Sequence, residues 1–302
     1  MRAAGIDIGT NTVRLIIADI KNNKIDRIIY QDRKITRLGK GIIHTNKLDE
    51  QAVLETVLAL KNYKEIIDLF YINKYLAVAT SAVREAKNSI NFINLCNEIG
   101  LNINIIDGNK EAKLTYLGVT SSLDIKDKNL LIFDIGGGST EFILNYNNQI
   151  NYKSIKLGVV KLADEINFID LITDEVIQKT NAIIEEKLSE IPYIKEVDTL
   201  IATAGTPTTL AAIDLELKDY DYRKVHGYEL SREKILNIFE KLRELTSKKR
   251  REVDGLEKGR EDLIIPGTLI ILKIMELTNC QKLIVSDFGL REGIVIHAAT
   301  TD

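Results

Sequence analysis

The chain has little cysteine and no long hydrophobic run. Its two cysteines, Cys96 and Cys280, lie far apart and have no second pair of ligands beside them, so neither a disulfide framework nor a zinc site is indicated. We expect both thiols in the core. No apolar run approaches the ~18 residues that span a bilayer, and the N-terminus lacks the layout of a signal peptide. These absences indicate a cytoplasmic protein that does not contact membranes.

An excess of positive charge is also absent. The net charge is −3 over 302 residues, which argues against broad binding to DNA. A polyanionic ligand would need a local basic patch, and the one basic run comprises Lys248, Lys249, Arg250 and Arg251. Such a run is typical of a solvated face, although it could also guide a polyanion.

The sequence does contain an internal repeat. Residues 3–8 and 13–20 read as apolar strands around a polar turn at 9–12, and residues 130–135 and 141–146 repeat this plan around a turn at 136–140. Since a chain of this length makes about two domains, we expect each domain to open with the same hairpin. Domain I is predicted over residues 1–120 with 287–302, and domain II over 121–286.

Helical and strand patterns alternate after each hairpin. In the first half, a helix is predicted over 49–70, strands over 75–80 and 101–106, and a further helix from Asn109. In the second half the predicted helices are 174–191, 208–217, 231–245, 262–277 and one after Gly289, with strands at 200–204 and 283–286. This alternation predicts an α/β fold with antiparallel opening hairpins.

Both hairpin turns have the composition of phosphate-binding loops. Several converging backbone N–H groups can hold a phosphate, and glycine lets the backbone come close enough. The second turn offers Gly136, Gly137 and Gly138 as well as the hydroxyls of Ser139 and Thr140. The first turn offers the four residues Gly9, Thr10, Asn11 and Thr12.

An acidic residue precedes each turn. Asp7 and Asp134 both begin an Asp-Ile-Gly sequence, and a strand-end carboxylate can hold a magnesium ion, usually through its waters. The alternative for either turn is an ordinary hairpin, because glycine and asparagine are favoured there. Finding the same sequence twice favours phosphate and metal binding.

A third loop precedes the helix predicted at 208–217. Gly205 and Thr206 follow a predicted strand, and Pro207 suits a first helical turn. The hydroxyls suit a simple helix cap, whereas the functional alternative is a nucleotide or anion site at a helix N-terminus.

Ordered segments along the whole chain resemble the signatures of the exopolyphosphatase and guanosine pentaphosphate phosphohydrolase family. They are DIGTNTVRL at 7–15, ATSAVREA at 79–86, DIGGGSTE at 134–141, ATAGT at 202–206 and GLREG at 289–293. The resemblance implies the two-domain actin-like fold of sugar kinases, Hsp70 and actin, with an interdomain cleft. It also implies a homodimer that uses magnesium, which a monovalent cation could accompany.

The family removes the terminal phosphoryl group of polyphosphate, or the 5′ phosphate of guanosine pentaphosphate. The general base of the family is a glutamate in a Gly-x-x-Glu-Ala segment. The resemblance implies that Glu111 is the general base in this chain. Arg84 resembles the family's phosphate-binding arginine, whose planar fork suits two phosphoryl oxygens. Asp7, Asp134 and Glu141 would organise the metal, and Glu141 could order the water.

Each of these residues also has a simpler interpretation. A glutamate such as Glu111 is favoured in a first helical turn by the helix dipole alone. Arg84 could form a surface ion pair with Glu85, and Glu141 could face solvent from a strand. Arg14 could reach the cleft or simply be exposed.

Two positions depart from the family pattern. Glu261 stands where alanine is common, and Pro207 interrupts a Gly-Thr-x-Thr loop. Long family members add a helical domain with a histidine-aspartate segment, and none of the three histidines here is followed by aspartate. The chain is therefore expected to be the short, two-domain form.

Two other functions remain open at this point. A kinase or ATPase of the same fold would share the phosphate loops, and a non-catalytic regulator would bind guanosine tetraphosphate without turnover. A regulator has no need of a base, so Glu111 favours an enzyme. The sequence does not separate polyphosphate from guanosine pentaphosphate, because both end in the same phosphoanhydride.

Overall fold

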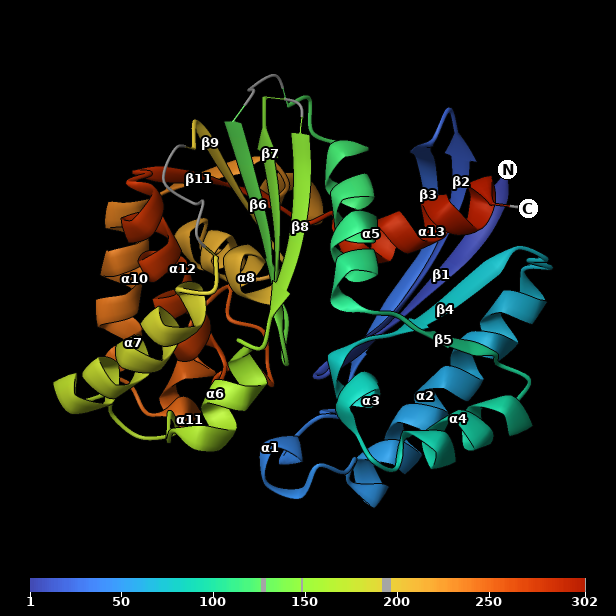
Figure 1. Ribbon diagram of the computed structural model, residues 1–302, viewed down its shortest axis with the longest axis horizontal. Helices are drawn as coiled ribbons and strands as arrows, with labels where there is room; N and C mark the ends of the chain where they lie inside the picture. Colours follow the sequence, from blue (N-terminus) through green and yellow to red (C-terminus); the bar gives the residue numbers. More distant parts are fainter. Residues whose placement is uncertain (126–128, 148, 192–196, 302) are drawn as a thin grey trace. The chain divides into compact units, whose positions relative to one another are not determined.

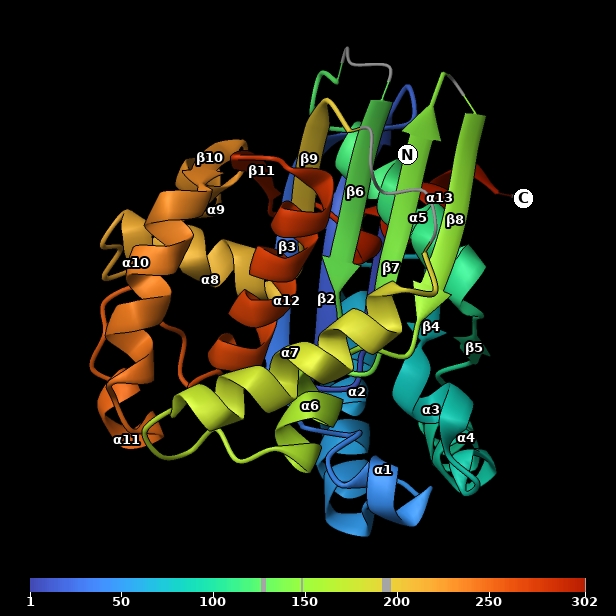
Figure 2. The same cartoon turned by 60° about the vertical axis from the view of Figure 1, so that its left-hand side comes forward.

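The computed structural model describes residues 1–125, 129–147, 149–191 and 197–301. The chain forms two compact units, which are Met1–Asp124 with Phe288–Asp302, and Ile125–Asp287. Figure 1 labels most of the helices and strands of both, and α9 and β10 are labelled in Figure 2. Within the described ranges, no helix combines the length and the apolar character that crossing a membrane requires.

The first unit is built on a five-stranded sheet of order β3-β2-β1-β4-β5. Its strands are β1 (Arg2–Ile8), β2 (Thr12–Lys21), β3 (Lys24–Ile35), β4 (Tyr75–Ala79) and β5 (Ile103–Ile105). The first three form an antiparallel meander, and β4 and β5 add in parallel beside β1. The predicted opening hairpin is confirmed, with a third strand that the sequence analysis did not assign.

Helices cover both faces of this sheet because its strands are apolar on both sides. Leu15 and Ile17 of β2 belong to one buried cluster, whereas Ile16 and Ala18 pack with the C-terminal helix in another. The helices are α1 (Ile42–Thr45), α2 (Glu50–Leu69), α3 (Ser81–Glu85), α4 (Ser89–Glu98), α5 (Gly108–Thr120) and α13 (Leu290–Thr300). In Figure 1, α5 and α13 lie on one side of the sheet and α2 and α4 on the other.

The second unit has a six-stranded sheet of order β10-β11-β9-β6-β7-β8. Its strands are β6 (Asn129–Ile135), β7 (Thr140–Tyr146), β8 (Gln149–Ile155), β9 (Thr199–Thr203), β10 (Tyr228–Ser231) and β11 (Lys282–Ser286). Strands β6, β7, β8, β9 and β11 repeat the directions and the order of β1 to β5. The repeat therefore extends well beyond the predicted hairpin.

The helices of the second unit pack around one long apolar helix. They are α6 (Val159–Glu165), α7 (Asp174–Leu188), α8 (Gly205–Asp214), α9 (Tyr222–Val225), α10 (Arg232–Arg243), α11 (Ser247–Arg250) and α12 (Ile264–Thr278). Almost all of α12 is buried, and α7, α8 and α10 all contact it. Figure 2 shows α8, α10 and α12 beside one another.

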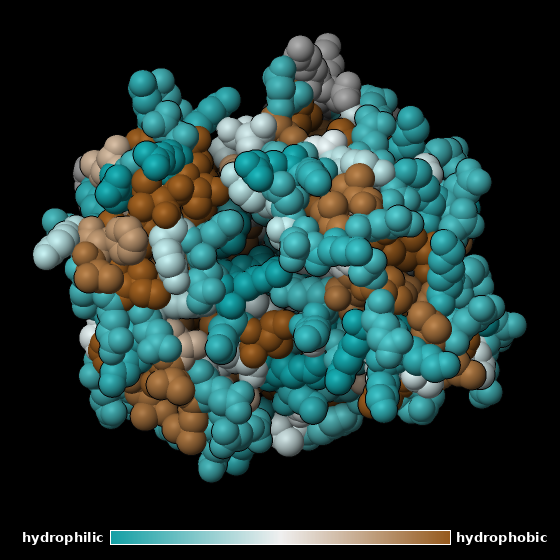
Figure 3. All heavy atoms as spheres, turned by 180° about the vertical axis from the view of Figure 1, so that it is seen from behind, coloured by the Kyte–Doolittle hydropathy of each residue, from teal (hydrophilic) through white to brown (hydrophobic). Residues whose placement is uncertain are grey.

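The outer surface is mixed in character. Figure 3 shows one face on which hydrophilic residues predominate and hydrophobic residues gather in separate patches. Such scattered apolar exposure is normal for a folded chain.

The basic run at 248–251 is only partly a solvated face. Lys248 and Lys249 are exposed, but Arg250 is fully buried and donates hydrogen bonds to four backbone carbonyl oxygens. Burial lowers the pKa of the Arg250 guanidinium to about 10, and the nearby charge of Asp262 opposes this decrease. Because this pKa is still well above 7, the side chain stays charged at neutral pH. The interpretation of Arg250 as a solvated or polyanion-guiding residue is wrong.

Glu261, the departure from the family's alanine, is part of the same structure. Its buried carboxylate accepts hydrogen bonds from Arg251 and from the Gly259 N–H. Burial raises the pKa of Glu261, but hydrogen bonds from its own backbone N–H, from Arg251 and from Gly259 outweigh that effect and hold the pKa below its usual value. The glutamate is therefore bound in its charged form and ties the loop before α12 to α11.

This depressed pKa predicts a pH dependence of stability. The contribution of Glu261 is present above the ordinary glutamate pKa and is lost as the pH falls through the lower folded-state pKa. Glu261→Gln is expected to lower the free energy of unfolding at pH 7 and to flatten its decline between pH 5 and 3, measured by urea denaturation. The exposed Glu252→Gln serves as control, and parallel pH profiles for wild type and Glu261→Gln would contradict the assignment.

Candidate active site

The first loop closes tightly at the end of β1. The Gly9 N–H donates to the Thr12 carbonyl oxygen at 3.0 Å, and a side chain at Gly9 would press on the same oxygen. Thr10, Asn11 and Thr12 are all buried. The loop is therefore a tight, buried turn, and phosphate binding by it stays a prediction.

Asp7 and Arg14 lie directly opposite each other beside this loop, on β1 and β2. Burial raises the pKa of the Asp7 carboxyl; Arg14 and Arg291 oppose this effect, and Glu292 adds to it. Arg14 is half-buried, so the interpretation as a simply exposed arginine does not hold. The strand pairing thus places one carboxylate and one guanidinium at the first loop.

Arg84 and Glu111 contact each other. Arg84 is at the end of α3, and its Nη1 donates to Glu111 Oε2 at 3.2 Å and to the Ile106 carbonyl oxygen at 2.7 Å. Glu111 is buried in the first turn of α5, where Asp107 accepts the Lys110 N–H at 2.8 Å as the helix cap. The structure brings together two residues that are 27 positions apart and were predicted for different roles in the same reaction.

Glu85, the alternative partner predicted for Arg84, has a hydrogen bond within its own helix. Glu85 accepts a hydrogen bond from Ser81 Oγ at 2.6 Å, within the same short helix. Arg84 forms an ion pair with Glu111, whose side chain is 9% exposed, against 25% for the arginine. A pair so shielded from water holds its geometry better than a surface pair.

The second loop rests on the start of α6. The Gly136 N–H donates to Ser139 O at 2.9 Å, and the carbonyl oxygens of Gly136 and Gly137 accept the N–H groups of Val159 and Val160. A Cβ on Gly158 would come within 2.3 Å of Gly137 O, so this close approach requires glycine.

Two carboxylates face each other across the second hairpin. Asp134 on β6 pairs directly with Glu141 on β7, and Ser154 on β8 donates to Glu141 Oε1 at 2.7 Å. Glu141 is almost completely buried, so the interpretation as a solvent-facing residue is wrong. Glu141 occupies the position that Arg14 has in the first hairpin.

This pair is a candidate site for a divalent cation. Among the residues that the structure describes, no group of three or more His, Cys, Asp or Glu residues could hold a metal. Magnesium is nevertheless often held by one or two carboxylates, with waters and substrate phosphates completing its shell. Asp134 and Glu141 offer that donor set, and Ser154 orients one of them.

The third loop begins α8 at Gly205, three residues before the predicted helix start. Ala204 has a positive φ of 81°, and no side-chain hydrogen bond caps the helix. The guanidinium of Arg260 lies against Gly205, where an added Cβ would be 1.7 Å from Nη1. The absence of a hydroxyl cap argues against simple capping, and a role in anion binding stays a prediction.

A family model matches residues 16–301, and its description is the Ppx/GppA phosphatase family. The chain belongs to this family. The resemblance inferred from the motifs is thereby confirmed.

Three curated proteins are similar to this Ppx/GppA chain. A bifunctional 3-dehydroquinate synthase/phosphatase of Fusobacterium nucleatum is 36% identical over 97% of this chain, which spans 46% of that protein. Exopolyphosphatase 2 of Mycobacterium tuberculosis is 27% identical over 99% of this chain and 98% of its own length. A guanosine-5'-triphosphate,3'-diphosphate pyrophosphatase of Aliivibrio fischeri is 26% identical over 96% of this chain and 58% of its own length.

A solved structure shares the fold. The Ppx/GppA enzyme of Aquifex aeolicus has 37% identity and a TM-score of 0.83, with 98% of this chain and 99% of that chain covered. Together with the repeated strand topology, this likeness confirms the predicted actin-like fold class.

One segment beside the first loop was not predicted from the family motifs. Residues 36–39 follow β3 and pack on the first loop, where Gly39 N donates to Thr10 O at 2.8 Å. The sequence signal for this segment is two closely spaced glycines, Gly39 and Gly41. The family resemblance as read from the sequence did not include this segment.

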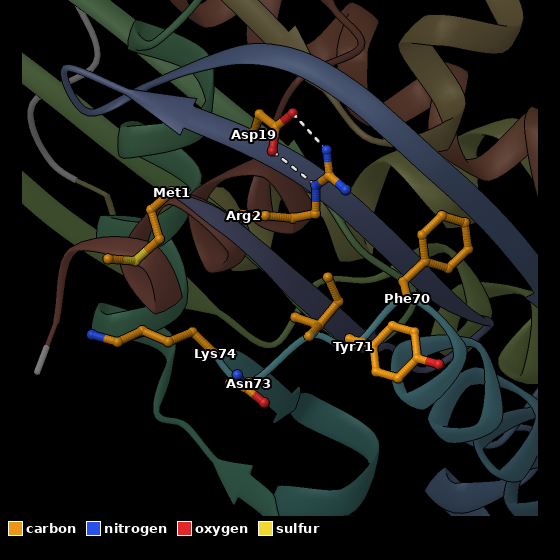
Figure 4. Close-up of a pocket in the computed structure, with 8 residues that line it drawn as sticks. Met1, Arg2, Asp19, Phe70, Tyr71, Asn73 and Lys74 are labelled. Atoms are coloured by element: carbon orange, nitrogen blue, oxygen red, sulfur yellow. Dashed lines mark hydrogen bonds and ion pairs between the residues drawn. The ribbon is translucent and has the colours of Figure 1, made fainter.

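A pocket elsewhere in the first unit contains none of the predicted site residues. It has a volume of about 430 Å³ and includes Arg2, Asp19, Tyr71 and Lys74 in its lining. Arg2 donates two hydrogen bonds to Asp19, as Figure 4 shows. Because Arg2 begins β1 and the first loop follows its other end, this pocket is separate from the phosphate loop.

Proposed function

We propose that the chain hydrolyses the terminal phosphoanhydride of inorganic polyphosphate with magnesium. The observation that carries this proposal is the contact of Arg84 with Glu111, because it sets a base beside a phosphate-binding guanidinium. The name and full-length match of the Mycobacterium tuberculosis relative support polyphosphate as the substrate.

Glu111 would act as the general base. A water molecule attacks the terminal phosphorus, the bond from that phosphorus to the bridging oxygen breaks, and the carboxylate takes the proton of the water. The products are inorganic phosphate and a chain shorter by one phosphate. Arg84 would neutralise oxygens of the transferred group and hold Glu111 in position, since such transfers depend mainly on positioning and charge.

Asp134 and Glu141 would hold the magnesium ion, which supplies charge neutralisation at the phosphoryl oxygens when bound. Asp7 would contribute through a bound water, because Arg14 takes the place of a second carboxylate in the first hairpin. The backbone N–H groups of the two loops would hold phosphate oxygens. Gly205 and Thr206 would bind a more distant anionic group.

Guanosine pentaphosphate is the second candidate substrate. It ends in the same kind of phosphoanhydride, and the relative from Aliivibrio fischeri is named for a guanosine substrate of this type. We also propose a cytoplasmic homodimer, as the resemblance to the family implies.

Phosphate release tests the proposal directly. Purified protein is incubated with long polyphosphate, tripolyphosphate or guanosine pentaphosphate, with magnesium or with EDTA, and free phosphate is measured. We expect magnesium-dependent release from polyphosphate without any acceptor molecule. Release that requires an acceptor would instead indicate a kinase, and binding of guanosine tetraphosphate without release from any substrate would indicate a regulator.

The metal assignment gives a separate prediction. Glu141→Gln removes one negative ligand but keeps the hydrogen bond to Ser154, so the magnesium concentration for half-maximal activity should rise at least about tenfold. Ser154→Ala should cause a smaller rise, because it affects only the orientation of Glu141. An unchanged magnesium requirement in Glu141→Gln would remove this residue from the metal site.

A further inference from the structure

The segment after β3 forms a second layer on the first phosphate loop. The N–H groups of Thr36 and Arg37 both donate to the Asn11 carbonyl oxygen, at 3.1 and 3.0 Å. A Cβ on Gly39 would lie 2.3 Å from the Thr10 side chain, so only glycine lets the segment come this close. Residues 36–39 are therefore built into the loop rather than being a free connection.

Arg37 has an unusual backbone for an arginine. Its φ is 51°, in the left-handed region, which is unfavourable for residues with a Cβ. The conformation is held by the Arg37 N–H bond to Asn11 and by the bond from Lys40 N to Arg37 O at 2.9 Å. Backbone strain that the surroundings enforce is concentrated at binding and active sites, so the enforced conformation favours a binding role for the Arg37 side chain.

Among the residues that the structure describes, two buried polar atoms at this junction find no hydrogen-bond partner. They are Asn11 Oδ1 and Thr36 Oγ1, in residues that are 8% and 4% exposed. Asn11 Nδ2 makes one long bond, 3.4 Å to Thr12 Oγ1. The orientation of an asparagine amide is assigned from its hydrogen bonds. If Oδ1 and Nδ2 of Asn11 were exchanged, the nitrogen would lack a partner in place of the oxygen.

These groups match the chemistry of a phosphate chain. A hydroxyl and an amide N–H can donate, and non-bridging phosphate oxygens accept. Buried polar atoms without partners cost stability. A phosphate oxygen would accept from the Thr36 hydroxyl, and a water held by the phosphate would donate to Asn11 Oδ1.

The charges around the loop point to the same ligand. Arg14 and Arg33 are directly opposite on β2 and β3, and like charges in this position repel. Arg37 adds a third guanidinium two residues after β3. Asp7 lies opposite Arg14, and Glu292 also acts on the Asp7 carboxyl. Three guanidinium groups placed along and just after two paired strands suit an anionic ligand.

We propose that Arg37, together with Thr36 and Asn11, binds the non-transferred phosphates of the substrate. This inference rests on the proposed function and adds a subsite to it. Arg84 and Glu111 act on the terminal phosphoryl group, whereas Arg37 holds phosphates further along the chain. The Arg37 subsite therefore favours polyphosphates with several phosphates over the shortest substrates.

Three variants at one position separate binding from backbone effects. Arg37→Gln and Arg37→Gly should both raise the KM for long polyphosphate about tenfold to a hundredfold, with kcat changed much less. Arg37→Gly should also raise the Tm, because glycine tolerates the left-handed backbone. Arg37→Lys, which keeps the charge but not the fork, should lie between wild type and Arg37→Gln.

Lys40→Gln is the matched control, since it removes one exposed positive charge from the same segment. Its KM should stay within about twofold of wild type. The inference is overturned if Arg37→Gln behaves like Lys40→Gln, or if the KM defect of Arg37→Gln disappears in Arg37→Gly. The second result would show that backbone conformation, and not the guanidinium, determines affinity.

A binding measurement distinguishes this inference from the proposed hydrolysis. In EDTA, where no turnover is expected, long polyphosphate should raise the Tm of wild type and of Lys40→Gln but not that of Arg37→Gln. A wild type that binds polyphosphate in this way yet releases no phosphate with magnesium would refute the hydrolysis alone. Equal Tm shifts in wild type and Arg37→Gln would refute the Arg37 subsite alone.

Discussion

Replacing Glu111 with glutamine is expected to lower kcat for phosphate release by about 10²–10⁴-fold, the usual contribution of a general base. Glutamine is close to glutamate in shape and can still accept the hydrogen bond from Arg84, but it cannot take a proton from water. The first turn of α5 and its Asp107 cap are unaffected. The KM should therefore change little, because substrate contacts remain.

Steady-state phosphate release with saturating magnesium measures this effect, and the Tm verifies folding. Glu85→Gln is the control, since Glu85 is a neighbouring carboxylate that bonds to Ser81 on α3 and has no assigned role in hydrolysis. We expect Glu85→Gln to retain nearly full kcat. Near-normal turnover in Glu111→Gln would show that another group accepts the proton.

The opening hairpins could be predicted because their information is local. An apolar strand, a short turn with glycine and a second apolar strand follow one another within about twenty residues, and pairing of such neighbours needs no distant contact. The third strand of each meander was not assigned. β3 contains Asp26, Arg27, Asp32 and Arg33 and exposes much of its length, so its pattern does not indicate a half-buried strand.

The contact of Arg84 with Glu111 could not be predicted from spacing. The two side chains follow neighbouring parallel strands, β4 and β5, and they meet because α3 and α5 both begin at the same edge of the sheet. A family resemblance assigned a role to each residue separately. Only the tertiary structure shows that one side chain binds and orients the other.

The burial of Arg250 had no local signal at all. In sequence it is one of four consecutive basic residues, and its neighbours Lys248 and Lys249 are indeed exposed. Its environment comes from distant segments, because the carbonyl oxygens that it contacts belong to Phe168, Asp170, Leu242 and Glu261. A sequence pattern cannot show where such acceptors converge.

Arg250→Met should therefore destabilise the second unit strongly. Methionine approximates the length of the arginine stem but donates no hydrogen bonds, so the carbonyl oxygens of Phe168, Leu242 and Glu261 lose a charged donor in the interior. We expect a loss of about 3–5 kcal/mol in the free energy of unfolding. At the scale of a domain of this size, that corresponds to a fall in Tm of roughly 10 °C.

Two further variants show whether the hydrogen bonds cause this effect. Lys249→Met removes an exposed charge one position earlier and should change the Tm little. Arg250→Lys keeps the charge but cannot reach as many carbonyl oxygens as a guanidinium, so its Tm should fall between those of Arg250→Met and wild type. If Arg250→Met were as stable as Lys249→Met, apolar packing of the side-chain stem alone would account for the stability of this region. The hydrogen bonds of the guanidinium would then not be what joins α11 to the loops around residues 170 and 261.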